Sequence, residues 1–159
     1  MKAATIHELK RELKNCSQNE LLEHCLRLSK FKKDNKELLT YLVFEAEDEF
    51  SYIESVKNEI DDQFTQVNKT GYYLIKKSVR KILRNVKKYI RYSGKKETEV
   101  ELLLHFCRAL KSLDPSYTGN TILLNTYIRQ VELIKKSITN LDEDLQYDYN
   151  LELEDLHEL

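Results

Sequence analysis

The chain has 159 residues, of which 33% are charged and 41% hydrophobic, with one proline, three glycines and no tryptophan. The longest uninterrupted apolar runs have about four residues, far fewer than the ~20 that span a bilayer. A domain of this length can bury a core without a disulfide or a metal. We predict an all-α protein, because the scarcity of turn residues favours helices over strands. The short apolar runs predict that the protein does not use a membrane.

The cysteines and the first residues predict the compartment. Three cysteines (Cys16, Cys25 and Cys107) are an odd number, and no two of them form a C-x-x-C pair. This usage is typical of free thiols in a reducing compartment. The first residues contain no signal-peptide apolar core. We therefore expect a cytoplasmic location.

A net charge of −1 hides a strong segregation of charge along the chain. Residues 1–36 carry +4, residues 37–62 carry −8, and residues 63–96 carry +11 with no acid at all. Residues 97–141 are balanced, and residues 142–159 carry −8. The +11 charge of residues 63–96 needs neutralising groups, either within the chain or on a binding partner.

Helix signals begin at the N-terminus. Two capping boxes, Thr5 with Glu8 and Ser17 with Glu20, predict the starts of the first two helices. Apolar residues at spacings of three and four then predict one long helix over 35–67, about 50 Å in length, with a kink or break near the acidic residues 45–49 as the alternative. Three more helices are expected, over residues 72–92, 97–113 and 121–141, and the second of these is stopped by Asp114-Pro115.

Two segments of the chain look like copies of one another. Residues 20–30 and 101–111 match at six of eleven positions, at an offset of 81. The match predicts an internal duplication with half-repeats 1–68 and 70–145. We expect about six helices arranged as antiparallel helix pairs, either a bundle or a short two-unit α-solenoid. The expected domain spans residues 1–145, and residues 146–159 are expected to form an acidic C-terminal tail.

The segment 72–92 is the clearest feature of the sequence. On a helical wheel its apolar residues share one arc of about 120°, and the opposite arc is cationic. The cations of this predicted polyanion or acidic-partner face are Lys76, Lys77, Arg80, Lys81, Arg84, Lys87, Lys88 and Arg91.

Two interpretations of this face are open. It could follow a phosphate backbone, with Tyr72, Tyr73, Tyr89 and Tyr92 stacking on bases. Alternatively, the acidic segments could fold back and neutralise it. The whole-chain charge near zero favours the second interpretation, because dedicated nucleic-acid binders are usually basic.

Paired Glu and His residues are the candidate metal ligands. Glu20 precedes His24, and Glu101 precedes His105, by four residues, which places each pair on one side of a helix. Two such helices resemble a di-metal bundle in outline. The di-metal proteins, however, use a Glu-x-x-His spacing, so surface pairing of each Glu with its His is the favoured interpretation.

Glu49 is the candidate buried carboxylate. It falls at the seam between Ala46 and Ile53 on the predicted long helix. A carboxylate there could act as a general base with a raised pKa. The favoured expectation is an ion pair with an arginine of the basic helix.

The segments Lys36–Ile60 and Lys96–Leu113, the second with a Glu-Leu-Leu-Leu-His-Phe-Cys core, resemble small all-helical bacterial proteins. Those proteins are classed only as a domain of unknown function. The resemblance implies a bacterial helical domain, and it brings no activity and no site residues.

These patterns favour a non-catalytic helical protein-interaction module that binds a protein partner or associates with itself. No nucleophile with a base and no glycine-rich loop is present, so neither an enzyme nor a cofactor is expected. The alternatives are an RNA- or DNA-binding protein that uses the basic helix 72–92, and a metal-binding helical protein.

Overall fold

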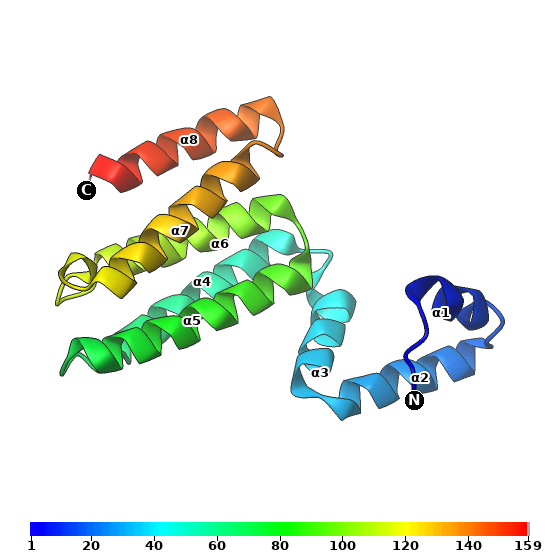
Figure 1. Ribbon diagram of the computed structural model, residues 1–159. Coiled ribbons are helices and arrows are strands. Elements are labelled where there is room, and N and C mark those ends of the chain that lie inside the picture. Colours follow the sequence, from blue (N-terminus) through cyan, green and yellow to red (C-terminus); the bar gives the residue numbers. More distant parts are fainter. Residues whose placement is uncertain (159) are drawn as a thin grey trace. The chain divides into compact units, whose positions relative to one another are not determined.

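The computed structural model describes residues 1–158, and all of their regular structure is helical, which confirms the all-α class (Figure 1). The described chain contains eight α-helices instead of the six expected. They are α1 (Ile6–Leu13), α2 (Gln18–Phe31), α3 (Lys33–Thr40), α4 (Glu49–Thr65), α5 (Tyr72–Ser93), α6 (Lys96–Lys111), α7 (Thr121–Ile138) and α8 (Glu143–Glu158). A π-helical turn at Tyr41–Glu45 precedes α4, and a 3₁₀ turn at Tyr117–Gly119 precedes α7. No described helix combines the length and the apolar character needed to cross a bilayer.

The segment 35–67 is not one continuous helix, and it breaks near the acidic residues, which was the alternative. The chain leaves the α-helical path at the π-helical turn, and α4 starts afresh after Asp48. The Asp48 carboxylate caps α4 by accepting a hydrogen bond from the backbone N–H of Ser51, at 3.1 Å. The physical reason lies in the acidic run. A continuous helix would place Glu45 and Glu49 one turn apart, where like charges repel, and aspartate is a good N-cap.

Residues 146–159 were expected to form an acidic tail. Most of them instead belong to α8, which spans Glu143–Glu158. The preceding helix α7 ends at Ile138, before the predicted limit. Tyr149, Leu153 and Leu156 on α8 are buried, and α8 packs against α6 and α7. The acidic residues of this segment therefore belong to a packed helix.

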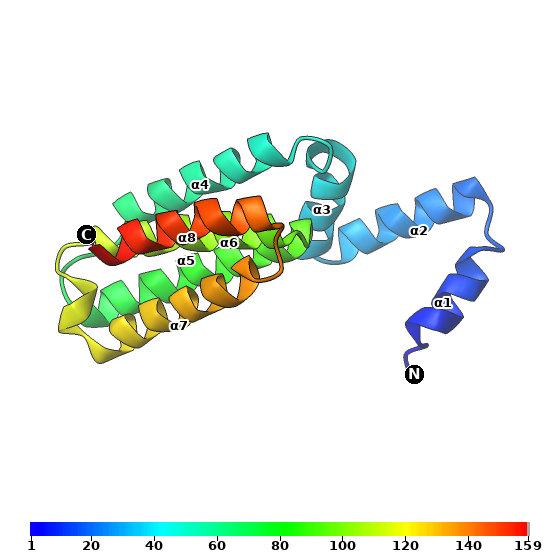
Figure 2. The same ribbon diagram turned by 90° about the horizontal axis from the view of Figure 1, so that it is seen from above.

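The chain divides into two compact units, and the first comprises Met1–Phe44. Both predicted capping boxes are present at the starts of α1 and α2. Helices α2 and α3 pack at a corner, where the side-chain amide of Asn35 donates to the Leu28 carbonyl at 2.8 Å (Figure 2). This unit has almost no interior: in the burial pattern of residues 1–44, only Ser29 and Tyr41 are buried.

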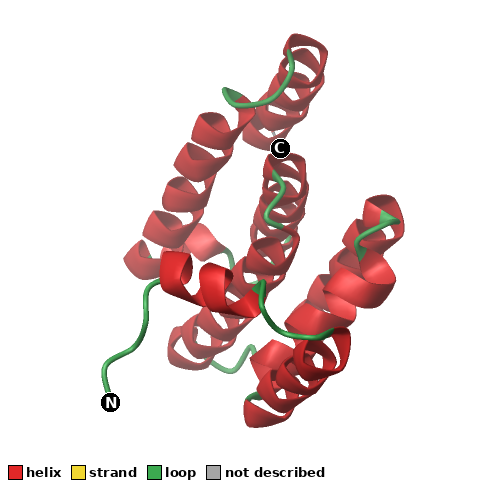
Figure 3. Ribbon diagram, turned by 90° about the vertical axis from the view of Figure 1, so that its right-hand side faces the viewer, coloured by secondary structure: helices red, strands yellow, loops and turns green. Residues whose placement is uncertain are grey.

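The second unit begins at Glu45 and holds the core of the protein. Helix α6 lies at its centre and packs against α4, α5, α7 and α8 (Figure 1). Figure 3 shows the helices in red and the connecting loops in green. Because neighbours surround α6, Leu102, Leu103, Leu104 and Phe106 are all fully buried, although they occupy more than one face of the helix.

Local signals set the ends of these helices. Gly94 ends α5 in the left-handed conformation, with φ +70°, which glycine adopts without strain. The Asn120 side chain caps α7 by accepting from the backbone N–H groups of Ile122 and Leu123. The predicted half-repeats meet at residues 68–70, inside the second unit, so the unit boundary does not coincide with them. The duplication stays a prediction.

Candidate interaction surfaces

The basic face of α5 is the outer surface of the second unit, as the wheel predicts. Ile75, Val79, Ile82 and Val86 are buried beneath it. Of the eight predicted cations, six are exposed and Lys76 and Lys88 are half-buried. Apart from Lys88, none of them forms an ion pair or hydrogen bond with another residue of the described chain. The repulsion between these cations is therefore left to solvent, salt or a ligand.

The acidic helices direct their charges elsewhere. On α4, Glu54 pairs with Lys57, and Asp61 pairs with His105. On α8, Glu152 pairs with Arg108 of α6 at 2.8 Å. Helix α8 packs on α6 and α7, on the side of α6 away from α5 (Figure 1).

Three of the four tyrosines expected to stack on bases are engaged within the unit. The Tyr72 hydroxyl donates to the Ser116 carbonyl, and the Tyr89 hydroxyl donates to Glu59. Tyr92 packs edge-on against Tyr89. Only Tyr73, which is 74% exposed, presents a free ring face.

A polar groove runs beside the basic face, between α4 and α5. It has a volume of about 330 Å³ and is lined by Gln63, Gln66, Ser78, Lys81, Ile82 and Asn85. The Asn85 amide donates to the Gln63 side chain at 3.2 Å across it. The lining contains no carboxylate, so the groove extends the cationic surface with neutral hydrogen-bonding groups. No sequence pattern predicts this groove, because its two walls come from different helices.

Glu49 lies at the junction of α4, α5 and α6, as a half-buried carboxylate. It accepts hydrogen bonds from the hydroxyls of Ser93 and Thr98, and it pairs with Lys95 at 3.0 Å. The expected partner was an arginine of the basic helix, whereas Lys95 follows that helix. Hydroxyls from α5 and α6 and the ammonium group of Lys95 around one carboxylate hold the ends of these helices together.

Glu101 is part of a network that joins α4, α6 and α8. It pairs with Lys57 at 2.7 Å and accepts a hydrogen bond from Tyr149 at 2.8 Å. Burial alone would raise the pKa of Glu101, but the hydrogen bonds from Lys57 and Tyr149 and the nearby positive charges outweigh it, so this pKa is lowered. Burial and the bond to Glu101 raise the pKa of Tyr149.

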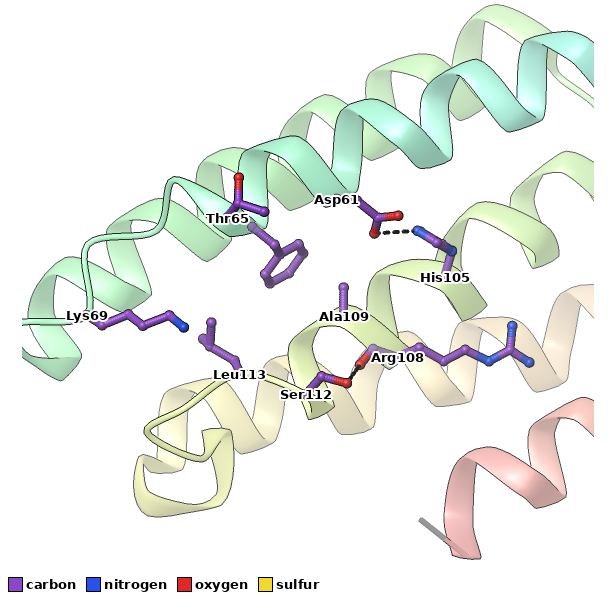
Figure 4. Close-up of a pocket in the computed structure, with 9 residues that line it drawn as sticks. Asp61, Thr65, Lys69, His105, Arg108, Ala109, Ser112 and Leu113 are labelled. Carbon is purple, nitrogen blue, oxygen red and sulfur yellow. Dashed lines mark hydrogen bonds and ion pairs between the residues drawn. The ribbon is translucent and has the colours of Figure 1, made fainter.

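His105 faces an open groove between α4 and α6, shown in Figure 4. Its Nε2 lies 2.7 Å from Asp61 Oδ1, and the Ser112 hydroxyl donates to the Arg108 carbonyl on its own helix. Ser112 and His105 are seven residues apart on one helix, about 10 Å along its axis, so they are not a nucleophile and base pair.

The predicted metal ligands do not converge. Glu101 and His105 each have their own partner on another helix. Glu20 instead closes the capping box of α2, and the hydrogen bonds from Ser17 lower the pKa of its carboxyl. Within residues 1–158, no group of three or more His, Cys, Asp or Glu side chains could hold a metal ion.

The first unit exposes an unusual amount of apolar surface. Besides Met1, its exposed large apolar side chains are Ile6, Leu9, Leu13, Leu21, Leu22, Leu26, Leu28, Phe31, Leu38, Leu42, Val43 and Phe44. We call this set the apolar arm surface. Its periodicity predicted a helical core face, and the sequence held no sign that the face would lack a covering helix.

The corner between α2 and α3 forms an apolar groove within this unit. It has a volume of about 260 Å³ and is lined by Cys25, Leu28, Ser29, Asn35, Leu38, Leu39 and Leu42. Helix α1 presents Ile6, Leu9 and Leu13 on one side, and all three are exposed. The unit therefore carries both an apolar groove and an amphipathic helix with an uncovered apolar stripe.

No family model matches the chain, and neither a curated protein nor a solved structure matches it. The resemblance to small helical bacterial proteins stays a prediction.

Proposed function

We propose that the protein is a non-catalytic helical interaction module, and that its first unit binds the first unit of a second copy. The observation that carries the proposal is the apolar arm surface: twelve exposed large apolar side chains, besides Met1, within 44 residues. Exposed apolar surfaces of more than a few hundred Å² are typical of protein-binding sites. The second unit, a bundle centred on α6, would act as the scaffold.

We favour a second copy of the chain as the binding partner. The apolar arm surface of the first unit needs covering, and the same unit carries a helix that could cover it. Units of about 40 residues usually need a disulfide, a metal or oligomerisation to fold stably. The three cysteines are free, and no metal-binding cluster is present in the described chain. Oligomerisation is the means of covering this surface that we favour.

The two apolar elements of the unit also complement each other. Ile6, Leu9 and Leu13 follow the i, i+3, i+7 spacing with which an amphipathic helix binds an apolar groove. The groove between α2 and α3 could receive this stripe from the other copy, and the same contact would recur by two-fold symmetry. Such an exchange places α1 of each chain on its partner.

Light scattering over a range of protein and salt concentrations tests the proposal. We expect a mass of two chains, twice 18.9 kDa, that persists at high salt because the contact is apolar. A dimer that dissociates at high salt would instead indicate α8 of one copy on α5 of another. A monomer under all conditions would refute self-association.

A matched pair of variants locates the interface. Leu9 on α1 and Leu151 on α8 are both 45% exposed. We expect Leu9→Asp to dissociate the dimer and Leu151→Asp to leave it intact. If the wild type is monomeric and Leu9→Asp lowers its melting temperature, the apolar arm surface is covered within one chain and the proposal fails.

A further inference from the structure

We propose that the basic face of α5 binds the phosphodiester backbone of a nucleic acid. The site comprises the eight cations of α5 and the polar groove between α4 and α5 beside them. It lies entirely in the second unit, so it is independent of self-association through the first. Three observations support it.

The first observation is that the face is open. The charge balance of the whole chain favoured internal neutralisation, which would need an acidic helix over α5. Helix α8 packs elsewhere, and the acids Glu54 and Asp61 of α4 pair with Lys57 and His105. The cations of α5 other than Lys88 have no ionic partner in the described chain.

The second observation is the spacing of the charges. The seven cations between Lys76 and Arg91 other than Lys88 occupy about 22 Å of helix axis, or one charge per ~3 Å. One strand of a duplex carries a phosphate per ~3.4 Å. The two linear charge densities match, which favours an extended anionic strand over a single small anion.

The third observation is the composition of the neighbouring groove. Gln63, Gln66, Ser78 and Asn85 supply amide and hydroxyl groups, and Lys81 lies among them. Such side chains make many of the contacts to phosphate and sugar in nucleic-acid complexes. Its volume, about 330 Å³, is at the lower end of the ~300–1,000 Å³ typical of ligand sites.

A membrane surface fits this face less well. Helices that lie on a bilayer insert an apolar face beside their cations. The apolar face of α5 is already buried in the unit, where Ile75 and Val79 are 0% exposed. Tyr73 is the only large apolar side chain of the helix that is mostly exposed.

Fluorescence anisotropy with labelled strands of about 16 nucleotides tests the proposal, with single-stranded RNA, single-stranded DNA and duplex DNA as separate arms. We expect binding at about 50 mM salt that weakens at least tenfold by about 200 mM. The strand that binds most tightly identifies the nucleic acid. No binding of any strand at low salt would overturn the proposal.

The decisive comparison uses two triple variants with the same change in charge. One is Arg80→Ala, Arg84→Ala, Lys87→Ala on the basic face. The control is Arg129→Ala, Lys135→Ala, Lys136→Ala on α7, where all three side chains are also exposed. We expect the first to weaken binding more than tenfold and to reduce the slope of log affinity against log salt by about 2, and the control to change both much less.

Two outcomes would assign the face to another partner. Equal losses in the two triple variants would show that binding depends only on net charge, and they would overturn the site. Competition by polyglutamate as effective as by RNA or DNA of equal charge, or tighter binding to phosphatidylserine vesicles, would replace the nucleic acid with an acidic protein or a lipid surface. Circular dichroism of each variant checks that the helices are retained.

Discussion

The packing of α8 can be tested with two leucines on that helix. Leu156 is 2% exposed, whereas Leu151 is 45% exposed. We expect Leu156→Ala to lower the free energy of unfolding of the second unit markedly, and Leu151→Ala to change it little. Both substitutions are Leu→Ala in the same helix, so they change helix propensity equally. The difference between their unfolding free energies therefore reports burial.

The size of the effect follows from the lost contacts. Buried Leu→Ala changes cost about 2–5 kcal/mol, and the cost falls when the surroundings can collapse. Leu156 lies near the end of α8, so we expect about 2–3 kcal/mol, against less than about 0.5 kcal/mol for Leu151→Ala. The Leu156 carbonyl accepts from Lys111 Nζ at 2.5 Å and from the Tyr127 hydroxyl at 3.5 Å, and both bonds survive the change to alanine.

Urea unfolding followed through tyrosine provides the measurement. The protein has no tryptophan, and nine of its ten tyrosines lie from Glu45 onward, so the tyrosine signal reports on the second unit. We expect a lower midpoint for Leu156→Ala with an unchanged dependence on urea concentration. Equal midpoints for the two variants would refute the packing of α8 against α6 and α7.

Two further predictions concern a helix end and the thiols. Gly94→Ala should cost about 1 kcal/mol in urea unfolding, because φ is +70° there, and Gly94→Asn should cost less because asparagine tolerates this conformation; equal costs would contradict the left-handed cap. In Leu9→Asp, where the proposed dimer no longer covers the groove, the exposed Cys25 should react quickly with a thiol reagent, whereas Cys107 should react only on unfolding, because burial raises the pKa of its thiol to about 12. Rapid reaction that persists in Cys25→Ser and proves to be at Cys107 would show that α6 is not enclosed.

Short-range signals predicted much of the fold. The capping boxes at Thr5 and Ser17 depend on residues three positions apart, and both are present. The stop at Asp114-Pro115 and the end of α5 at Gly94 are also decided locally. The all-α class followed from the same kind of evidence.

The features that were missed depend on residues far apart in the chain. The break at Tyr41–Glu45 lies in a segment whose apolar spacing suits a continuous helix, so periodicity could not decide between a continuous helix and a break near the acidic residues. The groove beside Lys81 has walls from two helices. For the apolar arm surface, periodicity identifies an apolar face, but it does not say whether another helix covers that face.

The charge segregation now has a physical account that the sequence alone left open. Sequence neighbours of opposite charge, such as 37–62 and 63–96, suggest mutual neutralisation, and α4 does pack against α5. Yet two helices meet through their apolar stripes, which turns charged arcs away from the contact. Glu54 and Asp61 of α4 consequently reach Lys57 and His105, and six of the eight cations of α5 are exposed to solvent. Amphipathic packing therefore keeps the two charged faces apart, and the basic face stays available to an anion from outside the unit.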